Sequence, residues 1–172
     1  AGSTWGPVGA ATADVGGGSI TAAGGAADRD AFVAKYNGPD GAHLWSLHFG
    51  GPADDFATAV ALDSGPNVLV AGAFSSSVSL GGTVLVNAGS YDAFLAQYAG
   101  TDGRHLWSRS FGGTTSDIAH ALAVDSRDDI VVAGQFQGIV SFGVVATSAG
   151  GYDAFLVKCS GVDGAPVWSR TL

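Results

Sequence analysis

One stretch of sequence occurs three times in this chain and constrains its fold more than any other feature. Residues 92–113 read DAFLAQYAGTDGRHLWSRSFGG, and similar stretches begin at Asp30 and Asp153. The three Asp residues are 62 and 61 residues apart. The same spacing separates Trp45, Trp107 and Trp168. Because a sequence that repeats at a fixed period is typical of one supersecondary unit used several times, we expect an array of three similar units.

Composition indicates that the unit is built from strands. Glycine accounts for 28 of the 172 residues, and all 15 acidic residues are Asp, with no Glu. Glu favours helices, whereas Asp and Gly favour turns. Val, Ser and Thr are also frequent, and Val and Thr are typical of strands. The sequence therefore predicts short strands joined by tight turns.

Each unit is expected to contain four strands, here called A, B, C and D in chain order. In the second unit they are residues 57–63 (ATAVALD), 68–72 (VLVAG), 93–98 and 106–111. The A–B turns are 63–67 (DSGPN) and 125–129 (DSRDD), and the C–D turns contain Asp-Gly. An Asp at the start of a turn can accept a hydrogen bond from the backbone two residues on. Successive hairpins of this kind predict an antiparallel meander.

The three units are expected to span about 8–52, 53–114 and 115–172. In the first unit, residues 8–14 (VGAATAD) and 19–24 (SITAAG) align with strands A and B. Between B and C the other two units carry long insertions, 75–91 and 137–152, which we expect to form small hairpins. The first unit has only 25–29 in the aligned place.

The strands lack a clean alternation of apolar and polar residues, as expected for sheets covered on both faces. Four-stranded sheets stacked face to face are the blades of a β-propeller. The predicted fold is therefore all-β, with three four-stranded antiparallel blades and an insertion between the second and third strands of two of them. Small residues in A and B suit an inner position, and the aromatic residues of C and D suit an outer one.

The repeated Trp45, Trp107 and Trp168 on strand D are large enough to fill the gap between adjacent blades. Burying such a side chain stabilises a fold by on the order of 2–3 kcal/mol. The alternative is a stacking platform for a sugar or a base. We expect the structural role.

The charge balance restricts the possible partners. The net charge is −8, with only seven Lys and Arg residues, which argues against nucleic acid and anionic membranes as partners. No apolar run is long enough for a membrane span, so we expect no membrane insertion. Cys159 is the only cysteine, so no intramolecular disulfide is possible. It replaces the tyrosines of the other units, and we expect a buried thiol.

Asp54, Asp55 and Asp117 lie in the D–A loops, on the face where the B–C insertions should also emerge. They are the candidate ligands for Ca²⁺, which prefers carboxylate oxygens. No D-x-[DN]-x-[DN]-G loop is present, so a structural role is favoured and no cofactor is expected. Asp30, Asp92 and Asp153 begin strand C and are expected to bind backbone N–H groups of the insertions, with metal binding as the less favoured alternative.

No G-x-S-x-G, H-E-x-x-H or P-loop motif is present, nothing singles out a pair of carboxylates, and the four His residues are not spaced for zinc. We therefore expect a protein that is not an enzyme.

The motifs A-V-D, V-x-V-A-G-x-F, V-x-[LF]-G, A-G-x-x-D-A-F-[LV]-A-K-Y and D-G-x-x-x-W-S together resemble the bacterial SBBP-type β-propeller repeat. The D-G-x-x-x-W-S element is also similar to the tryptophan-docking repeat of quinoprotein propellers. The resemblance implies a secreted or cell-surface bacterial protein and no particular activity. Since propellers typically have four to eight blades, three units predict self-association or further blades of a longer chain.

The sequence is compatible with three functions. The first is a non-catalytic extracellular module for protein interaction, adhesion or surface assembly. The second is a carbohydrate-binding propeller with Tyr91 and Tyr152 on its ligand face. The third is a fragment of a propeller enzyme, such as a lyase or a glycosidase, that uses Asp55 or Asp117.

Overall fold

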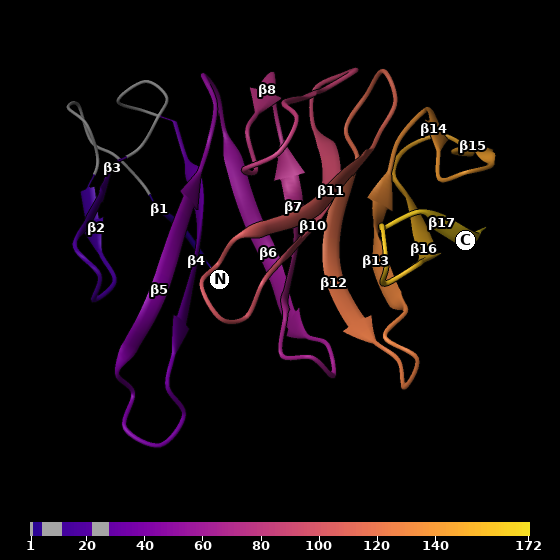
Figure 1. The fold of residues 1–172 in the computed structure, drawn as a ribbon. Coiled ribbons are helices and arrows are strands. Elements are labelled where there is room, and N and C mark those ends of the chain that lie inside the picture. Colours follow the sequence, from indigo (N-terminus) through magenta and orange to yellow (C-terminus); the bar gives the residue numbers. More distant parts are fainter. Residues whose placement is uncertain (1, 5–11, 22–27) are drawn as a thin grey trace.

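The computed structural model describes residues 2–4, 12–21 and 28–172, and these consist of strands and connecting loops (Figure 1). The strands of the first unit are β1 (Gly2–Thr4), β2 (Thr12–Asp14), β3 (Ser19–Thr21), β4 (Asp30–Tyr36) and β5 (His43–Phe49). Those of the second are β6 (Asp55–Leu62), β7 (Val68–Phe74), β8 (Ser77–Val78), β9 (Leu85–Val86), β10 (Asp92–Tyr98) and β11 (His105–Phe111). Those of the third are β12 (Ile118–Val124), β13 (Ile130–Phe136), β14 (Ile139–Ser141), β15 (Val145–Thr147), β16 (Asp153–Cys159) and β17 (Pro166–Thr171).

The second and third units each form the predicted four-stranded antiparallel meander. Their strand orders are β6-β7-β10-β11 and β12-β13-β16-β17, which correspond to A, B, C and D. The predicted turns also form: Asp63 and Asp125 accept hydrogen bonds from the backbone N–H groups of Gly65 and Arg127, two residues on. The predicted all-β fold of propeller-type blades is thus confirmed.

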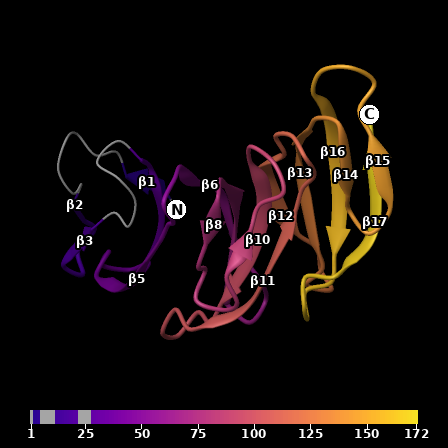
Figure 2. The same ribbon diagram turned by 90° about the horizontal axis from the view of Figure 1, so that it is seen from above.

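The sheets stack face to face, with the second between the other two (Figure 2). Every residue of β7 and β10 is buried, which explains why these strands are apolar on both faces. The A strands β6 and β12 lie against each other, and Thr58 Oγ1 donates a hydrogen bond of 2.7 Å to the Ala119 carbonyl. Small side chains in these strands permit this close approach.

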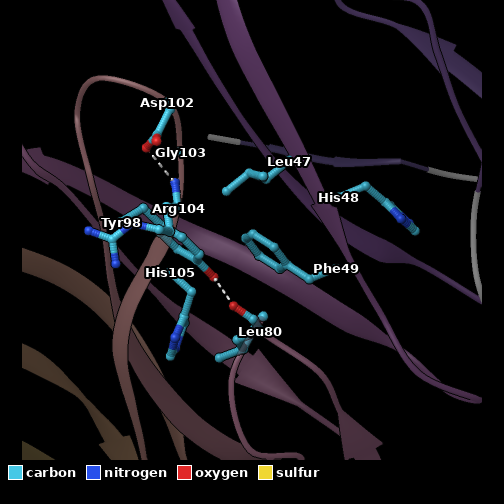
Figure 3. A pocket seen from close by; sticks show the side chains of 10 residues that line it. Leu47, His48, Phe49, Leu80, Tyr98, Asp102, Gly103, Arg104 and His105 are labelled. Carbon is cyan, nitrogen blue, oxygen red and sulfur yellow. Dashed lines mark hydrogen bonds between the residues drawn. The ribbon is translucent and has the colours of Figure 1, made fainter.

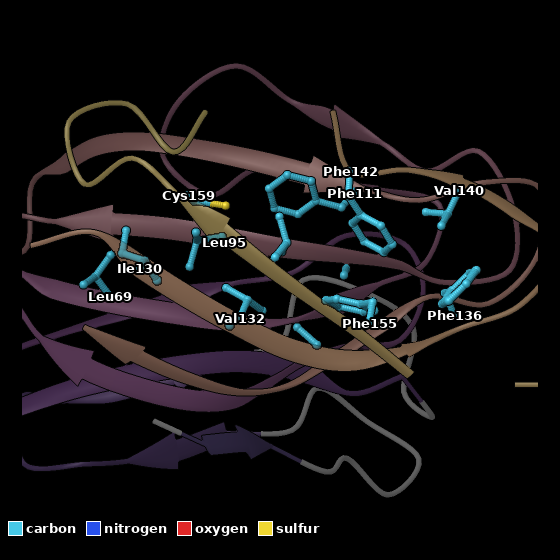
Figure 4. Packing of buried hydrophobic residues seen from close by; sticks show 14 residues of the cluster. Leu69, Leu95, Phe111, Ile130, Val132, Phe136, Val140, Phe142, Phe155 and Cys159 are labelled. Atoms are coloured by element: carbon cyan, nitrogen blue, oxygen red, sulfur yellow. The ribbon is translucent and has the colours of Figure 1, made fainter. Parts of the chain in front are cut away.

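Aromatic and aliphatic side chains fill the space between the sheets. Between the second and third sheets the cluster includes Leu95, Phe111, Phe142 and Phe155 (Figure 4). Cys159 lies in the same cluster and is fully buried, as expected, and burial raises the pKa of its thiol to about 12. A thiol in this environment is a poor nucleophile.

The first unit differs from the prediction. β2 and β3 pair with each other, but β4 is paired with β1 and β5, so the first sheet has three strands within the described residues. The assignment of 8–14 and 19–24 to strands A and B of this sheet was therefore wrong. Residues 8–11 and 22–24 lie outside the described part of the chain.

The hairpin β2–β3 instead takes the place of a B–C insertion. Gly16 and Gly17 lie against the ring of His43, just as Gly81 and Gly82 of the second insertion lie against His105. The prediction that the first unit has almost no insertion was therefore wrong. The hairpin β2–β3 carries an Asp turn, as the A–B hairpins do. In a sequence rich in Ala and Gly it is therefore easily mistaken for an A–B hairpin.

The two predicted insertions form the hairpins β8–β9 and β14–β15. Asp92 and Asp153 hold them as expected, because their Oδ2 atoms accept hydrogen bonds from the N–H groups of Ala88 and Ala149 at 3.0 and 2.7 Å. Both hairpins lie at the upper end of the strands in Figure 1, opposite the A–B turns. Within the described residues, no helix has the length and apolar character to cross a bilayer.

Candidate functional site

Two of the predicted site carboxylates lie at the junctions between adjacent sheets. Asp55 and Asp117 are fully buried. Their Oδ2 atoms accept hydrogen bonds from the N–H groups of Gly51 and Gly113, at 2.6 and 2.8 Å. Their own N–H groups donate to the carbonyls of Arg29 and Tyr91 in the preceding unit. Each Asp therefore closes its D–A loop and joins one sheet to the next.

The burial of these carboxylates changes their acidity. Burial raises the pKa of Asp55 to about 7, opposed by the hydrogen bond from Gly51 and reinforced by the charge of Asp30. Burial also raises the pKa of Asp92 to about 6, and the charge of Asp117 contributes to this shift. Raised carboxyl pKa values often mark catalytic groups. In this protein the raised pKa values belong to Asp55 and Asp92, whose side chains are buried from solvent.

Asp54 belongs to a separate, half-buried cluster on the same face. It pairs with Arg29 at 2.9 Å, and the hydroxyl of Tyr91 lies 3.3 Å from its Oδ2. Burial acts to raise the pKa of Asp54, but the hydrogen bonds and charge of Arg29 lower it overall. The ring of Phe56 contacts both partners: its centroid lies 5.4 Å from that of the Tyr91 ring and 5.6 Å from Arg29 Cζ.

Each of the three candidate Ca²⁺ ligands thus has at least one carboxylate oxygen bound by a group of the protein. Asp54 binds Arg29, while Asp55 and Asp117 bind backbone N–H groups of the D–A loops. Within the described ranges, no group of three or more His, Cys, Asp or Glu side chains could hold a metal ion. The geometry of these carboxylates suits the joining of sheets.

The three tryptophans of strand D occupy equivalent places with different surroundings. Trp45 is buried, and its indole N–H donates to the Gly100 carbonyl of the next unit at 3.2 Å. Trp107 is half-buried and lies against Gly164. Trp168 is 39% exposed. The first two therefore fill the space beside the C–D turn of the following unit.

The structure does not bring the two predicted ligand-face tyrosines together. Tyr91 is half-buried and contacts the Asp54 cluster, whereas Tyr152 is 53% exposed and belongs to the third unit. They are equivalent positions in two successive units, so their separation follows from the repeat.

A pocket of about 300 Å³ opens between the first and second units (Figure 3). Leu47, Phe49, Tyr98 and His105 are among the residues that line it. The hydroxyl of Tyr98 donates to the Leu80 carbonyl, and burial lowers the pKa of His105. Neither Tyr91 nor Tyr152 contributes to this pocket, so sequence reasoning did not locate it.

Sequence reasoning also missed the apolar surface of the insertion hairpins. Five aliphatic side chains there are more than half exposed. They are Val84 and Val86 beside and on β9, Ile139 at the start of β14, Val144 in the β14–β15 turn and Val145 at the start of β15. We call them the hairpin rim. The valine-rich runs in both insertions were visible in the sequence, but nothing showed which valines face solvent.

Comparison with known proteins supports the fold. No family model matches the chain. The chain is 30% identical over 112 residues to an uncharacterized WD repeat-containing protein, L264, of Acanthamoeba polyphaga mimivirus. The match covers 61% of this chain and 8% of that protein. This distant similarity to a WD repeat-containing protein agrees with the stacked four-stranded sheets.

Proposed function

We propose that the protein is a non-catalytic β-propeller repeat module of the SBBP type that serves protein interaction, adhesion or surface assembly outside a bacterial cell. The observation that carries the proposal is the hairpin rim. Surface aliphatic residues are ordinary when scattered singly, whereas exposed apolar patches are typical of contact sites for other proteins. Each of the two hairpins β8–β9 and β14–β15 carries at least two aliphatic side chains that are more than half exposed. The rim also lies at the loop end of the strands, where binding residues are usually found.

The state of the carboxylates supports a role without catalysis. A general acid or base must reach the proton that it transfers. Asp55 and Asp117 have no exposed surface, and each is held by a loop N–H. They serve as joints between sheets, so the two carboxylates that the lyase or glycosidase alternative would use are not accessible to a substrate.

Selection from a phage-displayed peptide library tests the rim. We expect the protein to select peptides rich in apolar residues. Their affinity should fall at least about tenfold, or about 1.4 kcal/mol, in the double variant Val86→Ser/Val145→Ser because each substitution removes exposed apolar contact area.

Leu62→Ser is the matched control, since Leu62 is 54% exposed and ends β6, at the A–B turn and away from the rim. Peptides that bind the double variant as well as the wild type would overturn the proposed site, and so would the absence of any selected peptide.

A carbohydrate-binding propeller is the second candidate, and the pocket between the first two units favours it. The pocket combines apolar walls with the polar side chains of His48, Asp102 and Arg104. A glycan array separates the two functions. Glycan binding that is lost in Arg104→Ala and retained in Val86→Ser/Val145→Ser would support the carbohydrate function against the protein-interaction function.

A further inference from the structure

The contact between successive units is made by the same positions each time. In the first unit these positions are Val33, Trp45 and Leu47, in the second Leu95, Trp107 and Arg109, and in the third Leu156, Trp168 and Arg170. The cross-strand register is identical: the first member of each set faces the third across strands C and D. We call the third set the end face.

In the two internal copies, the C–D turn of the following unit covers these positions. Gly103 lies over Trp45 and Gly164 over Trp107. Val33 and Leu95 are almost completely buried. At the second junction, Arg109 Nε donates to the Asp163 carbonyl at 2.9 Å, and its guanidinium lies 3.7 Å from the Asp163 carboxylate.

The end face has the same residue types as the second set, namely Leu, Trp and Arg. Among the described residues, no C–D turn covers it. Leu156, Trp168 and Arg170 line a hollow of about 280 Å³. The C–D turn of the first unit is the complementary surface. A Cβ placed on Gly41 meets nothing within 4 Å, and Asp40 is exposed. The two open surfaces are the two halves of the joint that is closed twice inside the chain.

We propose that the end face binds the C–D turn of the first unit of a second copy of this chain, head to tail. In this contact Gly41 would lie on Trp168 as Gly164 lies on Trp107. The charges also agree, because Arg170 takes the place of Arg109 and Asp40 that of Asp163. The inference rests on the assembly part of the proposed function and does not involve the hairpin rim.

The contact should be weak. Within the described residues the first sheet has no strand A, so a second copy covers the outer part of the end face and leaves the inner part of the third sheet open. Interfaces below about 1,200 Å² are typical of transient complexes. A head-to-tail contact is also heterologous, so it produces a ring if the rotation closes and an open chain if it does not.

Sedimentation equilibrium and NMR of the whole chain test this arrangement between about 10 µM and about 1 mM, which spans the affinities of weak complexes. We expect the average mass to rise above the 17.0 kDa of one chain as the concentration increases. Over the same range the indole N–H resonance of Trp168 should move, while that of Trp45 stays in place because Trp45 is already covered within the chain.

Charge reversal identifies the two surfaces. Arg170→Asp and Asp40→Arg should each weaken association at least about fivefold, and an equimolar mixture should restore it, since the reversed end face then meets a reversed turn. Arg104→Asp, with the same change in charge in the second unit, should associate like the wild type. Circular dichroism shows whether each variant is folded.

Three results would overturn the inference. The first is a constant mass of one chain with an unmoved Trp168 resonance. The second is association that persists in both single variants, because the contact would then lie elsewhere. The third is association that both variants lose and their mixture does not restore. Peptide binding at the hairpin rim would be unaffected in all three cases, so failure here is distinguishable from failure of the rim.

Discussion

At the scale of single residues, the buried carboxylates Asp55 and Asp92 are the least ordinary groups in the protein. Each has one oxygen that accepts a hydrogen bond and a second, buried oxygen with no partner among the described residues. A buried carboxylate that lacks part of its hydrogen bonding favours the protonated form. This explains why their pKa values rise even though N–H donors are close.

These raised pKa values predict how stability depends on pH. Because the folded protein holds a proton on Asp55 more tightly than the unfolded chain does, the stability from protonation is complete below about pH 4 and is lost as the pH rises through about 7. Asp92 acts in the same direction up to about pH 6. The melting temperature should therefore fall by several degrees between about pH 5 and about pH 8.

Asp55→Asn keeps an acceptor for the Gly51 N–H and removes the titration. In thermal unfolding followed by circular dichroism, this variant should lose part of the decline with pH and melt higher than the wild type at pH 8. Asp102→Asn in an exposed turn is the control and should follow the wild type. A wild-type melting temperature that rises over this pH range would contradict the account.

At the scale of elements, each insertion hairpin is fixed to strand D through glycine, a pair of glycines in the first two units and the single Gly143 in the third. The ring of His43 lies against Gly16 and Gly17, that of His105 against Gly81 and Gly82. In the third unit Pro166 lies against Gly143 in the same way. The absence of a Cβ at these positions lets the hairpin lie directly on an imidazole or a proline ring.

A methyl group at this contact should be costly. A Cβ on Gly82 would overlap the ring of His105, so Gly82→Ala should destabilise the protein by about 1–3 kcal/mol in denaturant unfolding. In the His105→Ala background the same change should cost much less, since the ring is gone. Gly150→Ala, where nothing lies within 4 Å, is the control. Equal costs in the two backgrounds would show that the hairpin does not lie on His105.

The elements that could be predicted from the sequence are those with a local signal. Asp63 and Asp125 begin turns whose hydrogen bonds reach only two residues along the chain, so their spacing was sufficient. The place of β2–β3 depends instead on a contact with His43 on a distant strand. Likewise, the exposure of Val86 and Val145 depends on the orientation of each hairpin relative to its sheet. The local sequence pattern does not determine that orientation.

At the scale of the whole molecule, the repeat predicts both the sheets and the way they stack. The apolar character of β7 and β10 on both faces indicated that a further sheet covers each side. The pocket beside Tyr98 was not predictable, because its walls come from two units and a hairpin whose packing only the assembled structure shows. The distant WD-repeat similarity agrees with this architecture.

The central claim is that adjacent sheets are connected by the same contact each time. In this contact a strand-D tryptophan packs on the C–D turn of the next unit. NMR at low concentration tests it directly through the Hα protons of three equivalent glycines. Those of Gly103 and Gly164 should show ring-current shifts and nuclear Overhauser effects to Trp45 and Trp107, whereas those of Gly41 should show neither. Three glycines with similar, unshifted resonances would contradict the stacked arrangement of the blades.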